Sequence, residues 1–579
     1  MKYFRCSALI AVLMLLLPFV LFSCSKKEAK KDAALTRTGK YGGSFYLATI
    51  SDPKSFNIIL AKETSTTAPL EYLFEGLTET DGVTTDVKPS LAESWEIKEG
   101  GRVYIMHLRK GVKWSDGETF TSKDVVFTYN DIIFNPDIPT DMRDIFLIEG
   151  KKIGVKAIDD YTVEFSLPFP QAPFLRQLSA TIMPEHVLSA AVKERKFNST
   201  WGVNEDPKNI IGTGPYRMVE YKQAEKIVYE RNPYYWRKAD NGDSLPYIDR
   251  IILFMVPDLN TLIMKFEKGE LDYLSLRPND YGTLKANEAN SNYLLYNTGP
   301  DLGTNFIVFN MNPEKNKKGK PHVAPYKLKW FRDLRFRQAV AHAIDKQSMI
   351  RNVYYGLGFP QDSAMSPSAK LFYNPNVKKY EYNLDKSRDL LAEMGFKDKD
   401  GDGILEDPDG KKLEINLNTN SGNDIREKIV EIIRDDLKKA GIKVNFQLLD
   451  FNFMVEKLDN TYDWEAIMIG LTGGIEPHFG RNVWWSGGQL HMWYPKQKKP
   501  DTAWEKEIDD IYDMGVKELD QVKRKALYDK WQVITAEQVP YIYTVNQASL
   551  FAIRKYVKNT KPSNYGGLLH NYYELYIQK

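Results

Sequence analysis

Acidic side chains are crowded into a short stretch that glycine interrupts: Asp398, Asp400, Asp402, Glu406 and Asp409. Counted from Asp398, they fall at positions 1, 3, 5, 9 and 12 of an EF-hand-like loop, and Gly403 takes position 6. Carboxylates at this spacing can converge on a hard cation that prefers oxygen ligands, so the stretch is a candidate structural calcium site. Position 12 is aspartate instead of glutamate, and a strand is expected where an EF-hand has its second helix. A plain acidic turn without an ion is therefore the alternative.

The sequence lacks the arrangements that secreted hydrolases use for catalysis. It contains no G-x-S-x-G nucleophile elbow and no HExxH zinc motif. Its 77 acidic residues are so numerous that a chance pair of carboxylates carries no information. The seven histidines are dispersed, and a metal site built from His478 and His491 is less favoured than hydrogen bonding near a cleft. These observations disfavour an enzyme, and no cofactor is required.

A loop rich in glycine and aromatic residues runs from Leu471 to Tyr494. Glycine lets a ligand approach the backbone closely, and aromatic rings supply flat apolar walls. The loop therefore predicts a ligand-binding cluster, and an aromatic surface loop packed against the body is the alternative. The expected contacts are Thr472, Gly473, Gly474, Glu476, His478, Trp484, Trp485 and Trp493.

The segment before this loop predicts the elements that position it. Hydrophobic alternation or apolar runs indicate strands at three places: 413–417, 442–448 and 466–470. Between the first two, isoleucines at helical spacing predict a helix, with Asp424 and Glu427 as a capping-box pattern and Gly441 as its stop signal. Strand, helix, strand, short helix and strand predict a parallel sheet with helices on its faces. Ligands bind beyond the carboxyl ends of the strands in such sheets, which is where the loop begins.

The N-terminal residues are typical of a secretion signal. Two basic residues precede an almost unbroken hydrophobic run at 8–22, which is shorter than the roughly 20 residues of a membrane span. Leu21-Phe22-Ser23-Cys24 resembles the lipobox of bacterial lipoproteins, in which the signal peptide is cut before a cysteine that carries the lipid. We expect a signal peptide at 1–23, a lipid on Cys24 and a polar tether at 24–40. An ordinary signal peptide or an uncleaved anchor is the alternative.

Charge and cysteine content narrow the classes of partner. Residues 1–23 contain two basic and no acidic side chains, so their removal leaves equal numbers of basic and acidic residues. A chain with no net charge gives no support to a nucleic-acid partner. The remaining chain has one cysteine, at its own N-terminus, and can form no internal disulfide. A large hydrophobic core is expected to stabilise it instead.

Several strings, in order along the chain, resemble one family: the bacterial extracellular solute-binding proteins of the oligopeptide, dipeptide and nickel group, family 5. Any one of them alone is weak evidence, whereas together they cover much of the chain. They include Tyr104-Ile-Met-His-Leu-Arg-Lys-Gly-Val-Lys-Trp-Ser-Asp-Gly117, Ile211-Gly-Thr-Gly-Pro-Tyr216, Arg231-Asn-Pro-Tyr-Tyr-Trp236, Leu245-Pro-Tyr-Ile-Asp249, Phe266-Glu-Lys-Gly-Glu-Leu-Asp272 and Asp333-Leu-Arg-Phe-Arg-Gln-Ala339.

The resemblance implies an α/β fold, the two-lobed periplasmic-binding-protein fold of type II in its large three-subdomain form, with the ligand cleft between the lobes. Lobe I would be discontinuous, with an inserted subdomain at 77–206 that contains short strands near 103–108 and 162–167. Two crossings between the lobes, near 299–309 and 541–549, would form the hinge. The implied lobes are 41–76, 207–304 and 541–579 for lobe I, and 305–540 for lobe II.

The resemblance also implies the substrate-binding component of an ABC importer, which captures a solute by closure of the lobes and delivers it to the permease. It would be a monomer, exported and lipid-anchored at the cell membrane, facing the periplasm or the cell exterior. An oligopeptide is the expected solute, and an oligosaccharide is the alternative within the family. A lipid-anchored chaperone that holds peptides, or an adhesin, is the alternative outside it.

The chain departs from the family at one position. Peptide-binding members commonly place an aspartate just after the strand that corresponds to 466–470, where it pairs with the amino group of the peptide. This sequence has Gly473 or Gly474 there, and glycine offers no charge-assisted hydrogen bond. Glu476 is the nearest carboxylate that could replace the aspartate.

Overall fold

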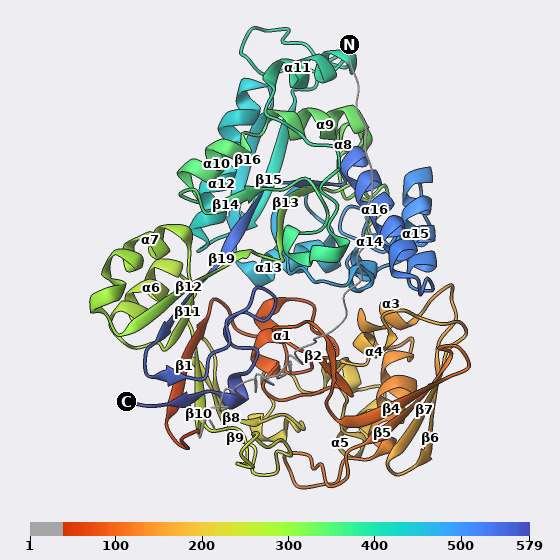
Figure 1. Ribbon diagram of the computed structural model, residues 1–579. Helices are drawn as coiled ribbons and strands as arrows, with labels where there is room; N and C mark the ends of the chain where they lie inside the picture. Colours follow the sequence, from red (N-terminus) through yellow and green to blue (C-terminus); the bar gives the residue numbers. More distant parts are fainter. Residues whose placement is uncertain (1–38) are drawn as a thin grey trace, which may run out of the picture. The chain divides into compact units, whose positions relative to one another are not determined.

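The computed structural model describes residues 39–579, which include a five-stranded sheet (Figure 1). The loop that the sequence predicts to bind a ligand follows β17, one strand of this sheet. β15 is parallel to both β16 and β17, whereas β13 is antiparallel to β17 and to β18. The predicted parallel unit is confirmed, and the sheet as a whole is mixed because β13 and β18 join it from distant segments. In spatial order the strands are β16 (Lys443–Leu449), β15 (Glu414–Asn420), β17 (Ala466–Leu471), β13 (Thr304–Phe309) and β18 (Tyr541–Tyr543).

Helix α12 (Asp424–Lys439) connects β15 to β16 and buries one apolar face, which includes Ile425 and Ile429. The capping prediction is wrong by one residue, because the N-cap is Asn423, whose Oδ1 accepts from the Arg426 N–H at 3.1 Å. Glu427 instead accepts from the Gly422 N–H at 2.8 Å. The amide of Asn423 caps as well as a carboxylate does, so sequence alone could not separate the two positions.

Helices cover the five-stranded sheet and share one hydrophobic core with it. Asp333 and Asp345 cap α9 and α10 as aspartate N-caps do, each accepting a backbone N–H at 2.9 Å. The covering helices are α8 (Pro325–Arg332), α9 (Leu334–Ala343), α10 (Lys346–Asn352), α11 (Leu384–Glu393), α13 (Phe451–Glu456), α14 (Arg481–Trp484), α15 (Ala503–Gly515) and α16 (Gln521–Gln538).

Two further sheets are built from the N-terminal, middle and C-terminal parts of the described chain. One has the order β1 (Ser44–Thr49), β10 (Arg250–Met255), β9 (Lys226–Arg231) and β8 (Tyr216–Lys222). In the other, β19 (Val545–Arg554) pairs with β11 (Tyr273–Ser275), β12 (Tyr293–Pro300) and β14 (Gly358–Pro360). Their helices are α1 (Thr64–Leu70), α6 (Leu259–Glu267) and α7 (Pro278–Asn287). A short pair joins β20 (Val557–Lys558) to β21 (Tyr576–Ile577).

A separate core lies around an antiparallel sheet in the 77–206 segment. The two strands predicted there are confirmed as β5 and β7. The order is β4 (Ala92–Lys98), β5 (Val103–Leu108), β7 (Thr162–Ser166) and β6 (Gly154–Asp159), with β2 (Thr78–Thr80) and β3 (Val87–Pro89) as a hairpin beside it. The helices are α2 (Ser122–Phe127), α3 (Met142–Phe146), α4 (Phe174–Gln177) and α5 (Glu185–Lys193).

The chain passes between the β19-containing sheet and the five-stranded sheet at 300–304 and again at 543–545, and β14 also reaches the β19-containing sheet from within 305–540. Both places fall inside the hinge segments that the sequence predicts. Strand β18 falls within the range predicted for lobe I, 541–579, but it pairs with β13, which falls mainly within the range predicted for lobe II, 305–540. The division of the chain into two lobes stays a prediction. The chain leaves the five-stranded sheet after Tyr543, where β18 ends, and not at residue 540. The predicted signal peptide, Cys24 and most of the tether lie outside the described residues.

Candidate functional site

A cleft opens beyond the carboxyl ends of β15 and β17, where sequence reasoning places the ligand. The central cavity, about 300 Å³, is lined by residues that follow β1, by the start of α12 and by the end of β17. A charged cavity of about 330 Å³ and an aromatic cavity of about 400 Å³ share Lys62 and Leu490 with it. These cavities therefore form one site between the β1 sheet and the five-stranded sheet.

The predicted contacts divide into two groups. Part of them lines the aromatic cavity, namely Thr472, Gly473, Gly474, Glu476 and Trp484. The other three, His478, Trp485 and Trp493, line none of the three cavities. The backbone N–H and C=O groups of 472–474 make no hydrogen bonds within residues 39–579. This part of the loop therefore offers free backbone groups to a ligand.

Glu476 is already engaged in an ion pair. Its carboxylate is 7% exposed and accepts from both terminal nitrogens of Arg524, from Nη1 at 3.0 Å. The same carboxylate accepts the His478 backbone N–H at 3.1 Å and so caps the short helix η7 (Pro477–Gly480). A carboxylate with this many donors is satisfied without a ligand. Glu476 therefore holds the loop, and it is a poor substitute for the missing aspartate.

His478 and His491 are buried and bound to different carbonyl groups. Nε2 of His478 donates to the Ile145 carbonyl at 3.0 Å, and Nδ1 of His491 donates to the Val483 carbonyl at 3.0 Å. Burial lowers the pKa of His478 to about 3, with Arg481 adding to the effect. Burial also lowers the pKa of His491 to about 4. Both imidazoles are therefore neutral at physiological pH, and they serve as hydrogen-bonding residues of the packed loop.

The tryptophans of the loop belong mainly to an aromatic cluster behind the aromatic cavity. Trp484 lies within ring contact of Trp493, Trp531 and Tyr541, with centroids 5.1 to 5.7 Å apart. Trp493 is 1% exposed, and its Nε1–H donates to Glu505 at 3.0 Å. Trp485 stacks under the Arg481 guanidinium at 4.5 Å. Trp484 is thus the member of the predicted set that presents an aromatic wall to the cavity.

Arg426 is a cleft residue that sequence reasoning missed. Its guanidinium lies against the end of β17, where a Cβ on Gly470 would come within 2.7 Å of Nη2. Nη1 donates to the side-chain oxygen of Asn420 at 2.8 Å, and no carboxylate pairs with Arg426 among the described residues. Burial lowers the pKa of Arg426 to about 10, so the group stays charged at neutral pH. It therefore offers an unneutralised cation to the central cavity.

Contacts from the 77–206 segment seal the cleft on the side of α3. Asn482 donates to Asp141 Oδ2 at 3.0 Å, and the Gln489 N–H donates to Asp144 Oδ2 at 2.9 Å. The Ala172 N–H donates to the Val516 carbonyl at 2.8 Å. These bonds join elements on opposite sides of the cleft, so the described arrangement is a closed one.

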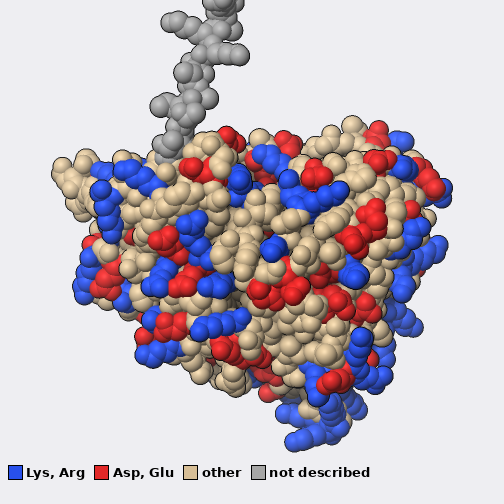
Figure 2. Space-filling model, turned by 90° about the horizontal axis from the view of Figure 1, so that it is seen from below, with Lys and Arg blue, Asp and Glu red and all other residues tan. Residues whose placement is uncertain are grey.

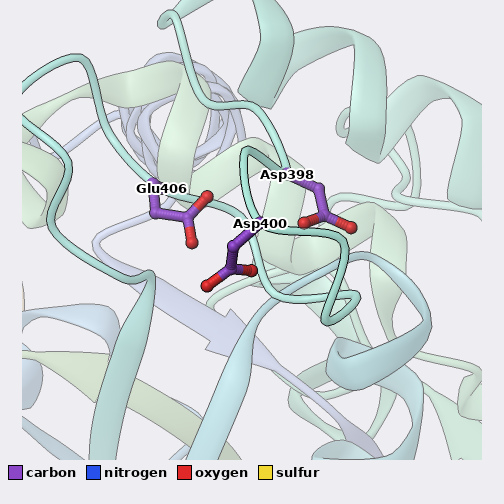
Figure 3. Close-up of side chains that lie close together, drawn as sticks. All are labelled: Asp398, Asp400 and Glu406. Atoms are coloured by element: carbon purple, nitrogen blue, oxygen red, sulfur yellow. The ribbon is translucent and has the colours of Figure 1, made fainter.

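The acidic loop lines none of the three cavities, and Figure 3 shows the side chains of Asp398, Asp400 and Glu406 close together. Asp398, Asp400 and Glu406 place carboxylate oxygens within 4.8 Å of one another, whereas Asp402 and Asp409 do not join them. Lys412 forms ion pairs with Asp400, at 2.9 Å, and with Asp402. Calcium takes six to eight oxygen ligands, so the three carboxylates would need additional ligands and would compete with this lysine.

No helix within residues 39–579 has the length and hydrophobicity needed to cross a membrane. On the face seen in Figure 2, basic and acidic side chains are interspersed over most of the surface. Such a surface favours solubility without a strong field of one sign.

Comparisons with known proteins address the chain as a whole. A "Probable ABC transporter-binding protein" of Deinococcus radiodurans is 31% identical over 540 residues, which cover 88% of each chain. The oligopeptide-binding protein AppA of Bacillus subtilis is 32% identical over 475 residues, 80% of each chain. The structure of AppA in complex with a nonapeptide superposes with a TM-score of 0.79 over 94% of this chain and all of AppA.

The fold recurs in a protein that holds a different kind of ligand. The periplasmic binding protein MelB of Agrobacterium fabrum, solved in complex with stachyose, is 23% identical and has a TM-score of 0.82. The match covers 93% of this chain and 85% of MelB. A family model described as "Bacterial extracellular solute-binding proteins, family 5 Middle" matches residues 86–491. The chain therefore belongs to family 5 of the bacterial extracellular solute-binding proteins, and its α/β fold is the two-lobed fold of that family.

Proposed function

We propose that this protein is the substrate-binding component of an ABC importer, and that its solute is an oligopeptide. The protein would capture the solute in the cleft by closure and deliver it to the membrane permease. It would act as an exported monomer held at the membrane by a lipid on Cys24, with no catalytic step of its own. Nucleic acid is not among its partners in this proposal.

The free backbone of residues 472–474 is the observation that carries the peptide assignment. Thr472 and Gly473 are exposed at the cavity, and their N–H and C=O groups have no partners among the described residues. An extended peptide can pair with such groups through its own main chain, which gives affinity without regard to sequence. Similarity to AppA supports the same solute class.

An oligosaccharide is the second candidate, and the aromatic cavity favours it. Trp484 and Trp531 line that cavity, and flat indole faces suit the apolar faces of sugar rings. The Trp531 Nε1–H is buried without a hydrogen-bond partner within residues 39–579, so it is free to donate to a hydroxyl or a carbonyl oxygen. Mass spectrometry of the solute that co-purifies with the protein separates the two candidates.

A Gly474→Leu variant tests whether this cleft binds the solute. A Cβ at Gly474 would meet no atom within 4 Å, so the new side chain fills cavity space without displacing the fold. We expect at least a tenfold loss of affinity for the co-purifying solute, measured by calorimetry, with an unchanged melting temperature. Gly282→Leu is the matched control, because Gly282 is exposed in α7 and its Cβ position is also open.

Uptake by intact cells tests the transport role itself. Deletion of the gene should abolish uptake of the solute identified by mass spectrometry, and the unmodified gene should restore it. Normal uptake together with altered adhesion or protein folding would favour the chaperone or adhesin alternative instead. Affinity for Gly474→Leu equal to that of the unmodified protein would place the solute elsewhere.

A further inference from the structure

Asp459 is a cleft carboxylate without a partner. It lies in the π-helical turn η6 (Lys457–Thr461) and lines both the central and the charged cavity. Within residues 39–579, no hydrogen bond or ion pair engages its side chain. The other carboxylates of the cleft are occupied, since Glu476 binds Arg524, Asp141 accepts from Asn482, and Glu63 accepts from the Thr66 hydroxyl at 2.5 Å. Asp459 alone among these has its full capacity to accept hydrogen bonds free.

Charged side chains of both signs lie around Asp459. Lys62 and Lys54 attract it, whereas Glu63 and Asp141 repel it. Lys496 also lines the charged cavity, and none of the three lysines forms an ion pair with Asp459 among the described residues. Burial is the largest reason why the pKa of Asp459 is raised, and an added cation would reverse that penalty. Lys62 lines the central, charged and aromatic cavities, yet it forms no ion pair with Asp459 among the described residues. Both side chains line the central and charged cavities, where a ligand group can reach them.

Arg426, a cation without a carboxylate partner among the described residues, lines the same central cavity. Among residues 39–579, its guanidinium is hydrogen-bonded only to the neutral oxygens of Asn420 and Asn305. It lies in the first turn of α12, where the helix dipole adds positive potential. The 300 Å³ cavity therefore carries an unneutralised cation beside β17 and a free carboxylate on η6.

We propose that the cleft selects zwitterionic solutes, with a ligand ammonium on Asp459 and a ligand carboxylate on Arg426. Each ligand charge compensates a protein charge that the fold leaves unpaired. A neutral solute would leave both groups desolvated and unpaired in the closed state, which is costly. The inference rests on the proposed solute-binding function and narrows it to peptides and related amino-acid derivatives with free ends.

Chemically blocked peptides test the two charges separately. The probes are a mixture of short unmodified peptides of varied sequence, the same mixture acetylated at the amino end, and the same mixture amidated at the carboxyl end. We expect each blocked mixture to bind the unmodified protein about 10- to 100-fold more weakly, because a charge-assisted hydrogen bond is lost. Retention on the immobilised protein, read by mass spectrometry, gives the relative affinities.

Asp459→Asn assigns the ammonium to its residue. The amide keeps the size of the side chain and removes its charge, so we expect the preference for free over acetylated peptides to disappear. The preference for free over amidated peptides should persist, since Arg426 is unchanged. Asp435→Asn is the matched control, because Asp435 is exposed on α12 and pairs with Arg434 at 2.8 Å outside the cleft. Unchanged melting temperatures show that each variant is folded.

The outcomes separate this inference from the proposed function. If Asp459→Asn retains the full preference for free amino ends, or if acetylated peptides bind equally well to the unmodified protein, the inference is wrong. Binding of raffinose or stachyose with no binding of any peptide mixture would overturn it and leave solute binding intact. No binding of peptides or sugars, together with unchanged uptake after gene deletion, would overturn both.

Discussion

At the scale of single residues, the loop after β17 shows that a residue type suited to ligand contact can serve the fold instead. Glu476 and His478 stand where ligand contacts were expected, yet their polar groups are bound to Arg524 and to the Ile145 carbonyl. The cost of an unpaired buried charge explains this use of Glu476, because Arg524 is itself only 6% exposed. The groups left free for a ligand, Asp459 and Arg426, lie on other elements.

Glu476→Gln should therefore affect stability more than binding. Removal of the negative charge leaves Arg524 buried without a counter-charge, and we expect a loss of about 3 kcal/mol in the free energy of unfolding. Urea denaturation measures it, and calorimetry on the folded variant should find solute affinity changed by less than about threefold. A large loss of affinity at unchanged stability would make Glu476 a ligand contact. Replacement of Arg524 by Met in the same chain should recover part of the stability.

Calcium binding by the acidic loop stays a prediction at this scale. If the carboxylates of Asp398, Asp400 and Glu406 hold the ion, calcium should raise the melting temperature of the unmodified protein, and Asp400→Ala should abolish that rise. Lys412→Ala should enlarge the calcium effect, because it removes the cation that competes for Asp400. The absence of any shift in the unmodified protein would identify the loop as an acidic turn.

At the scale of elements, α3 and its N-cap residue Asp141 form the contact between the 77–206 segment and the loop after β17. Asp144 is buried there and accepts the Gln489 N–H at 2.9 Å. Burial raises the pKa of Asp144 to about 6, and Asp141 adds to the shift while Arg481 opposes it. Below about pH 6 this carboxyl group is therefore mainly neutral in the folded protein.

The sign of the pH dependence follows from that shift. Between pH 4 and 6 the folded protein holds a proton on Asp144 that the unfolded chain has released, so the contribution of this group to stability falls as pH rises through this window. Asp144→Asn keeps an acceptor for Gln489 and removes the titration. The quantity to compare is the free energy of unfolding of the variant minus that of the unmodified protein. We expect this difference to be roughly 2 to 3 kcal/mol larger at pH 7 than at pH 4, as measured by urea denaturation. An identical difference at both pH values would contradict the burial of a titrating Asp144.

At the scale of the whole molecule, the proposed lipid on Cys24 gives the binding protein a place to act. Tethering keeps a receptor at a high effective concentration near the transporter that it serves. Cys24 lies outside the described residues, and the support for its lipid is the lipobox-like sequence Leu21-Phe22-Ser23-Cys24.

Cys24→Ser should separate anchoring from binding. We expect the variant to leave the membrane fraction and to bind solute with unchanged affinity, because the cleft is built entirely from residues after position 39. Cell fractionation and calorimetry on the same preparation measure the two effects. A Cys24→Ser protein that stays in the membrane fraction would favour an uncleaved anchor.

The sequence by itself determined the elements whose patterns are local. The β15–α12–β16 unit and the strand β17 follow from hydrophobic periodicity and from the stop signal Gly441, which lies just after α12. It also determined that a loop rich in glycine and aromatic residues follows β17. The family motifs then predicted the fold of the whole chain.

Only the tertiary structure decided which polar groups are free. The pairing of β13 and β18 joins segments more than 200 residues apart, and the same kind of long-range contact pairs Asp144 with Gln489 across the cleft. Whether a carboxylate serves the fold or the ligand depends on partners that the chain brings from a distance. The sequence could therefore place a cleft at the end of β17, and the fold decided that Asp459 and Arg426 face it unpaired.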